Sequence, residues 1–188
     1  MKSRYVACWL VGAWIAGSLF MILVATQNFR SVDRLLAAPA SARAPFEKMG
    51  HQEARTFLRY QVSEQNRWYF ETWETVQLAL GLALIASLWR QGKLVVSLAA
   101  AMFALLLVER LYLTPEIIRL GRSIDFIPQA TPSQDRNIFW RFHGVYSGVE
   151  LLKLALGFLL SGRLIFGGNR TGVELDVIDE ADHGHVNR

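Results

Sequence analysis

Two residues of opposite charge lie inside an otherwise apolar segment of the chain. Glu150 and Lys153 belong to the stretch 142–166, about 12 and 16 Å past its first residue along a helix. A charge at the middle of a bilayer costs about 3 kcal/mol or more, so each needs a partner or must be neutral. Their i, i+3 spacing allows them to pair with each other, and Arg110 is a second possible partner for Glu150.

Further ionisable residues occur at the ends of apolar segments that share one side of the expected bundle. With the first pair they define a predicted intramembrane polar layer, which comprises Glu71, Glu74, Glu109, Arg110, His143, Glu150 and Lys153. Ionisable groups within membranes often belong to ion pathways or proton relays. The layer could therefore bind a solute, an ion or a proton, or it could be a structural pair that fixes the register of the helices.

Small residues occupy another face of the same predicted helix. Gly144, Gly148 and Ala155 would let a second helix approach closely. That helix could belong to the same chain or to another molecule, and the sequence leaves both possibilities open.

Four apolar segments predict helices that cross a hydrocarbon core of about 30 Å. The expected spans are 5–25, 73–89, 94–113 and 142–166. Arg90-Gln91-Gly92-Lys93 predicts a tight turn between the second and third spans, and Thr114-Pro115 predicts an end to the third span or the start of a new turn. We predict an all-α membrane protein whose residues 1–168 form a four-transmembrane-helix up-down bundle in a bacterial inner membrane.

The second helix is expected to be much longer than its span. No Gly or Pro occurs between residues 51 and 80, and Ala54, Leu58 and Val62 recur at helical spacing. We predict one helix over 52–89, about 55 Å long and projecting from the bilayer.

Three other segments are expected to lack long helices. Residues 28–46 and 116–138 predict long loops, the second beginning with a short interfacial helix. Residues 169–188 are polar and aperiodic, which predicts a disordered tail.

The composition agrees with a membrane location. The chain is 52% hydrophobic, with six Trp and eleven Phe, which is too apolar for an ordinary soluble domain. Its net charge is +4, but no two Lys or Arg residues are adjacent, so a nucleic-acid partner is not expected. The scattered basic residues suit lipid headgroups, and their distribution leaves the orientation unresolved.

Residue types that would indicate a cofactor or an enzyme are scarce. His143 is the one histidine at a suitable depth, so haem is not expected, and no Cys, Met or His cluster predicts a metal site. No phosphate loop, dinucleotide fingerprint or nucleophile elbow occurs. Glu71, Glu74 and Glu109 could act as acid/base groups, but nothing supplies a nucleophile. We predict no cofactor, and a membrane enzyme stays a second alternative only.

Several short segments resemble a known family. Residues 139–147, Phe-Trp-Arg-Phe-His-Gly-Val-Tyr-Ser, resemble the F-x-R-x-H-G-x-S-S segment of the transmembrane protein two-hundred-and-five family. Residues 111–115 resemble that family's apolar-to-Pro exit from the third span, and Gly12-Ala13-Trp14 matches its Gly-Ala-Trp. The resemblance implies a four-span membrane protein and no specific activity. Glu150 stands where such sequences tend to carry Asn.

The lead hypothesis is a non-enzymatic membrane protein that acts by association. It rests on the small-residue face and on the long projecting helix, which could dock further copies of the chain or other membrane subunits. The alternative is a small-solute or ion-handling protein that uses the intramembrane polar layer. In both cases the chain is expected to contact membrane lipid.

Overall fold

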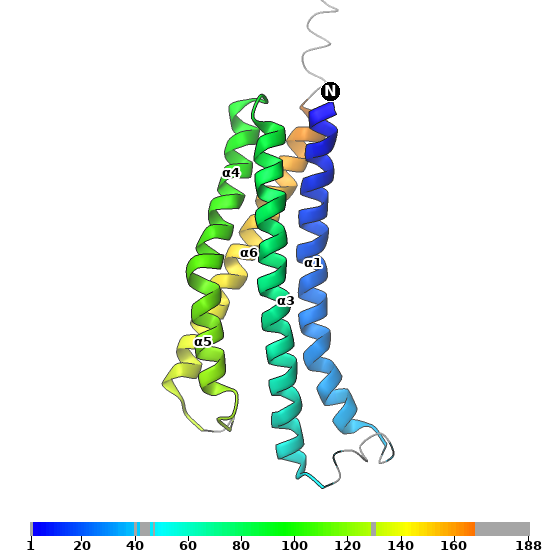
Figure 1. Ribbon diagram of the computed structural model, residues 1–188, viewed down its shortest axis with the longest axis vertical. Coiled ribbons are helices and arrows are strands. Elements are labelled where there is room, and N and C mark those ends of the chain that lie inside the picture. Colours follow the sequence, from blue (N-terminus) through cyan, green and yellow to red (C-terminus); the bar gives the residue numbers. More distant parts are fainter. Residues whose placement is uncertain (1, 40, 42–45, 47, 129–130, 168–188) are drawn as a thin grey trace, which may run out of the picture.

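The computed structural model describes residues 2–39, 41, 46, 48–128 and 131–167. Within these residues the chain is all-helical and forms four long helices, as the sequence predicts (Figure 1). In chain order the elements are α1 (Lys2–Ala37), α3 (His51–Leu88), α4 (Lys93–Val108), the π-helical turn η2 (Glu109–Leu113), α5 (Thr114–Ile124) and α6 (Gln134–Phe166). The elements α4, η2 and α5 follow one another as a single long helix. The predicted tail, 169–188, lies outside the described residues.

The four helices run up and down beside one another. Figure 1 shows α1 and α3 side by side, α4 and α5 next to α3, and α6 crossing behind them. We call the end with the tight 89–92 turn the turn half. The other end, where α1 leads to α3 and α5 leads to α6, is the connection half.

Large apolar side chains cover the outside of the bundle. Two helical stretches, Ser3–Ala37 and Lys93–Ile124, are long and apolar enough to cross a membrane, and each contains an 18-residue window with a mean hydropathy of 2.1. Exposed apolar side chains also occur on the other two helices, among them Leu82 on α3 and Phe158 on α6. A soluble bundle would turn such side chains inward, because contiguous exposed apolar surface favours association with lipid or protein.

A closely packed apolar core fills the turn half. Leu84 and Leu88 of α3 meet Met102 and Leu106 of α4, and residues of α1 and α6 complete the cluster. Its other buried members are Ala7, Val11, Trp14, Ala99, Leu160 and Leu164. Among the buried side chains of this core, the indole of Trp14 is the polar group, and its Nε1 has no hydrogen-bond partner within the described residues.

Of the two alternatives predicted at Thr114-Pro115, the structure shows the start of a new helical turn, α5, and the helical run does not stop there. Proline in a regular helix lacks an N–H and clashes with the carbonyl four residues earlier. Here the Thr114 N–H bonds to the Glu109 carbonyl, five residues back, which widens the turn just before Pro115. The wider turn accommodates the proline, and the helix runs on to Ile124.

Both predicted loops are also shorter than expected. The helix α1 extends to Ala37, and only residues 125–133 separate α5 from α6. Side-chain pairing explains the first extension, because Asn28 Nδ2 donates to Asn66 Oδ1 at 2.7 Å and Arg55 pairs with Asp33 at 3.1 Å. Asn28 and Asp33, which the sequence places in a loop, therefore lie on α1 and face partners on α3.

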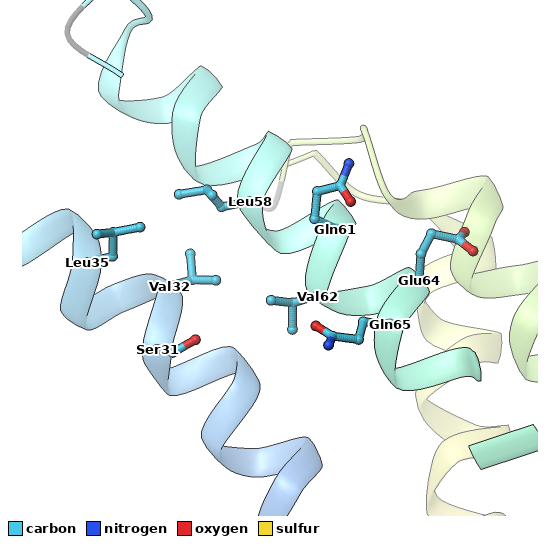
Figure 2. A pocket seen from close by; sticks show the side chains of 8 residues that line it. All are labelled: Ser31, Val32, Leu35, Leu58, Gln61, Val62, Glu64 and Gln65. Atoms are coloured by element: carbon cyan, nitrogen blue, oxygen red, sulfur yellow. The ribbon is translucent and has the colours of Figure 1, made fainter. Parts of the chain in front are cut away.

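The helix α3 confirms the prediction of one long second helix, and it ends within a residue of the expected bounds. The ends of α1 and α3 in the connection half extend beyond those of α5 and α6 (Figure 1). Figure 2 shows Val32 and Leu35 of α1 facing Leu58 and Val62 of α3 there, beside a groove of about 390 Å³. A small apolar cluster thus holds the two projecting ends together.

Candidate functional site

The Lys153 side chain is fully buried and meets three partners from three helices. Its ammonium group donates to Gln77 Oε1 at 3.0 Å, to Glu150 Oε1 at 2.9 Å, and to Glu109 Oε2. An ammonium group has three N–H donors, so every donor of Lys153 is used.

The first helix joins the same arrangement through Gln77. Its amide nitrogen donates to Ser18 Oγ at 3.2 Å, while its oxygen accepts from Lys153. Both Gln77 and Ser18 are buried. The amide is therefore oriented from both sides, and all four helices contribute to one network.

A second carboxylate lies one helical turn from Gln77. Glu74 is fully buried, and its Oε1 accepts from the Thr114 hydroxyl and, at 3.5 Å, from the Tyr146 hydroxyl. Its Oε2 lies 3.5 Å from a guanidinium nitrogen of Arg110. We call the whole set the buried polar cluster, which comprises Ser18, Glu74, Gln77, Glu109, Arg110, Thr114, Tyr146, Glu150 and Lys153.

Helix geometry explains how the chain gathers these groups. The i, i+3 pairs Glu74–Gln77 and Glu150–Lys153 each occupy one face of their helix. Glu109 and Thr114 are five residues apart, which would place them about 140° apart around a regular helix. The π-helical turn brings both to the buried side. The π-helical turn therefore brings both Glu109 and Thr114 into the cluster, whereas a regular helix would bring in only one of them.

Negative charge exceeds positive charge in this cluster. Three carboxylates face the ammonium of Lys153 and the guanidinium of Arg110, whose side chain is 34% exposed. Within the described part of the chain, no group donates to Glu109 Oε1 or to Glu150 Oε2, and both atoms are buried. Buried carboxylate oxygens without partners are costly. A proton on either of these two oxygens would remove the excess charge.

The structure separates the predicted polar layer into two groups. Glu109, Glu150 and Lys153 meet directly, and Glu74 and Arg110 lie beside them. The Glu71 side chain is exposed, and only its carbonyl contributes, accepting from Arg110 at 3.3 Å. His143 is exposed and stacks on Phe139, with ring centroids 5.8 Å apart, away from the cluster.

Four members of the cluster were absent from the predicted layer: Ser18, Gln77, Thr114 and Tyr146. Two of them carried a usable signal. Gln77 is one turn from Glu74, and Tyr146 shares a helical face with Glu150. Ser18 and Thr114 gave none, because a hydroxyl in an apolar helix commonly bonds to its own backbone.

A cavity of about 280 Å³ leads from the connection half to this cluster. Its lining includes Phe29, Asn66, Phe139 and His143, and it reaches the side chains of Thr114 and Tyr146. Those two hydroxyls both bond to Glu74, so they are the cluster members that lie between the cavity and the Glu74 carboxylate.

The predicted helix-packing residues face away from the bundle. Gly144, Gly148 and Ala155 are exposed, and a Cβ added at either glycine would meet no atom within 4 Å. No helix among the described residues covers this face. It is therefore free to meet lipid or another molecule.

A charged clasp joins α3 to α5 at the connection end. Arg67 pairs with Asp125 at 2.8 Å and with Glu64, and Glu64 also pairs with Arg122 at 3.1 Å. The hydrogen bond from Arg122, with further help from Arg67, holds the pKa of the Glu64 carboxyl below its ordinary value. Burial raises the pKa of Asp125, against the hydrogen bond from Arg67.

Comparisons with family models, with curated proteins and with solved structures found no match to this chain. Among the described residues, no group of three or more His, Cys, Asp or Glu side chains has a geometry that could hold a metal ion. In the buried polar cluster an ammonium group occupies the centre of the carboxylates. The function must therefore be argued from the chemistry of the cluster itself.

Proposed function

We propose that the chain is an integral membrane protein with four transmembrane spans that takes up and releases a proton at the buried polar cluster. This belongs to the ion-handling class of function. It requires that all four helices cross the membrane and that the protonation of the cluster changes during function.

The exposed apolar side chains support four spans. They occur on every helix around the cluster, including α3 and α6, which carry charged members of the cluster within their apolar stretches. Lipid is the solvent in which such a surface is stable. The resemblance of residues 139–147 to the transmembrane protein two-hundred-and-five family adds the same expectation.

The observation that carries the proposal is the unbalanced set of buried charges around Lys153. Glu109 and Glu150 each use one oxygen on the ammonium group and leave the other without a donor among the described residues. Carboxylates so close together share protons as a coupled set, and one proton would neutralise the excess charge. A structural ion pair alone would be expected to satisfy these oxygens.

The π-helical turn supports a working site over a static one. Proton and ion carriers often place their sites where a transmembrane helix is interrupted. Single π-turns within helices are rare overall, and those that do occur are often found at functional sites. In this chain the interruption, η2, is the segment that supplies Glu109 and Arg110.

Proton flux through reconstituted vesicles tests the proposal. The protein is placed in vesicles that hold a pH-sensitive dye, and a potassium diffusion potential drives proton entry. We expect faster entry than in protein-free vesicles, and at least about a tenfold loss of that excess rate in Glu109→Gln. Glu71→Gln is the matched control, because this carboxylate is exposed on the same side of the bundle.

Two results would contradict this function. One is a wild-type rate equal to that of empty vesicles. The other is a Glu109→Gln protein that keeps the full rate. If the substitution alters only thermal stability, the cluster is a structural element and the proposal fails.

Association is a second candidate, favoured by the uncovered small-residue face of α6. Gly144, Gly148 and Ala155 point away from the core, and close backbone approach at such faces stabilises helix pairs in membranes. The partner we propose is a second copy of this chain. Its test is disulfide formation in a Cys8→Ser background. Gly148→Cys should crosslink two copies, whereas Val145→Cys, an exposed position about 100° from Gly144 around the helix, should not.

A further inference from the structure

The cavity of the connection half ends at two hydroxyl groups that both bond to one buried carboxylate. It draws its lining from α1, α3, α5 and α6, and the lining includes the hydroxyl side chains of Thr114 and Tyr146. Both of these side chains are buried, and both donate to Glu74 Oε1. Glu74 itself does not line the cavity.

From this geometry we infer that the cavity is the water-filled entrance to the buried polar cluster and that Tyr146 and Thr114 relay protons between the two. The inference rests on the proposed function, since it names the route and the side by which the proton enters. It adds two residues that transfer the proton and a direction of access.

The relay conserves bonds and charge at each step. The hydroxyl of Tyr146 or Thr114 passes its proton to Glu74 Oε1, and its oxygen accepts another proton from a hydronium ion in the cavity, which is left as water. One O–H bond breaks and one forms at the hydroxyl, while one proton is added to Glu74. Glu74 lies one helical turn from Gln77, so the change in its charge acts on the Lys153 group at short range.

Access is expected from one side only. The polar lining of the cavity includes Asn66, Arg67 and His143, which favour water. Beyond the cluster, the turn half is closed by fully buried apolar side chains, among them Leu88, Met102 and Leu160. A dry, close-packed segment of this kind blocks proton movement in the conformation described. The connection half is therefore the loading side.

Thiol labelling tests the entrance independently of proton flux. Cys8 is the only cysteine, so a Cys8→Ser protein provides a cysteine-free background. Single cysteines are placed at Ile117 in the cavity wall, at exposed Thr131 in the α5–α6 connection, and at buried Leu106 in the turn half. A charged, membrane-impermeant maleimide is then added to each side of sealed vesicles in turn.

We expect Ile117→Cys to react from the same side as Thr131→Cys, and Leu106→Cys to react from neither side. Labelling of Ile117→Cys from the opposite side, or no labelling of it in a folded protein, would overturn the proposed entrance.

Flux measurements test the relay. Tyr146→Phe keeps the ring that meets Phe70 edge-on at a centroid distance of 6.0 Å, and Thr114→Val keeps the side-chain shape. The double variant should lose at least about tenfold of the excess proton rate, with a larger slowing in deuterated water than the wild type shows. A folded double variant with the full rate would refute the relay.

The two ideas fail in different ways. If Ile117→Cys is labelled from the connection side but the protein moves no protons, the proposed function is refuted and the water-filled cavity is supported. If proton flux is normal but Ile117→Cys is not labelled, the proposed function is supported and the proposed entrance is refuted.

Discussion

The two halves of the bundle are stabilised by different kinds of contact. In the turn half, Leu84, Leu88, Met102 and Leu106 interlock with residues of α1 and α6, and each contact is a weak dispersion attraction. In the connection half, Lys153 and its carboxylates form a few strong, directional contacts at the bundle centre.

This difference determines what each half can do. Apolar side chains have no state of charge, so the turn half can close the bundle on that side but cannot bind a proton, and release on that side would require its helices to move apart. The buried polar cluster has several protonation states, each with its own set of favourable hydrogen bonds. The connection half also contains η2 and the cavity, the two features that interrupt regular packing. The apolar core thus closes one half, and the groups that can change protonation lie in the other.

The largest expected effect comes from removing the central ammonium group. Lys153→Met keeps most of the side-chain volume but leaves Glu109 and Glu150 buried without their common partner. Breaking a buried ion pair in this way costs about 3–5 kcal/mol of the free energy of unfolding. Denaturation in mixed detergent micelles measures it.

The rescue experiment makes this prediction specific. Adding Glu109→Gln and Glu150→Gln to Lys153→Met removes the unpaired charges and should recover most of the lost stability. A triple variant no more stable than Lys153→Met would mean that packing, and not charge, holds this half together.

A smaller loss is expected from a cavity in the turn half. Leu160→Ala removes a fully buried side chain from the apolar core. In lipid the loss is mainly one of packing contacts, so we expect about 2 kcal/mol, the lower end of the range for such changes. Leu159→Ala is the matched control, because its side chain is 60% exposed. Proton flux should persist in both variants; its loss in Leu160→Ala would mean that the turn half takes a direct part in proton transfer.

The boundary between the halves is sensitive to added volume on α1. A Cβ at Gly17 would overlap the indole of Trp73, whereas one at Gly12 would meet nothing within 4 Å. Gly17→Ala should therefore cost about 1 kcal/mol, since the indole can shift in part. Gly12→Ala should be neutral or slightly stabilising because alanine favours helix. Thermal unfolding compares them, and equal midpoints would contradict the close approach of α1 and α3.

Much of the helix pattern could be predicted, because it depends on local periodicity. The unbroken 51–80 segment gave α3 almost to the residue. The π-helical turn could not be predicted from local rules. It lets the helix accommodate Pro115, and the helix continues because α5 packs against α6. Local rules predict that a proline ends a helix, and here tertiary contacts keep the helix going. The extension of α1 was missed for a similar reason, as Asn28 finds its partner on another helix.

Only part of the candidate site could be found from the sequence. Glu150 and Lys153 were recognisable because a charge within an apolar segment demands a partner nearby. Their contacts with Gln77 and Glu109 depend on how three helices are rotated, which spacing within one helix does not give. His143 illustrates the opposite error: it lies close in sequence to the cluster residues but stacks on Phe139 at the surface.

The smallest effect concerns the charged clasp of the connection half. The pKa of Glu64 is lowered in the folded state, so its contribution to stability is present above its unfolded pKa and disappears as pH falls through the folded value. The raised pKa of Asp125 acts in the opposite sense, favouring the folded state in acid. The two contributions partly cancel in the wild type, and a comparison with Glu64→Gln separates them.

The stability difference between wild type and Glu64→Gln should be greatest at neutral pH and vanish in acid, where the Glu64 carboxyl is itself neutral. Thermal midpoints across the acid range measure it, with Glu53→Gln, an exposed carboxylate on α3, as the control. A difference that persists in acid would mean that Glu64 acts through packing and not through its charge. In that case the clasp, like the turn half, would be stabilised by packing. Stabilisation by charge would then be confined to the buried polar cluster.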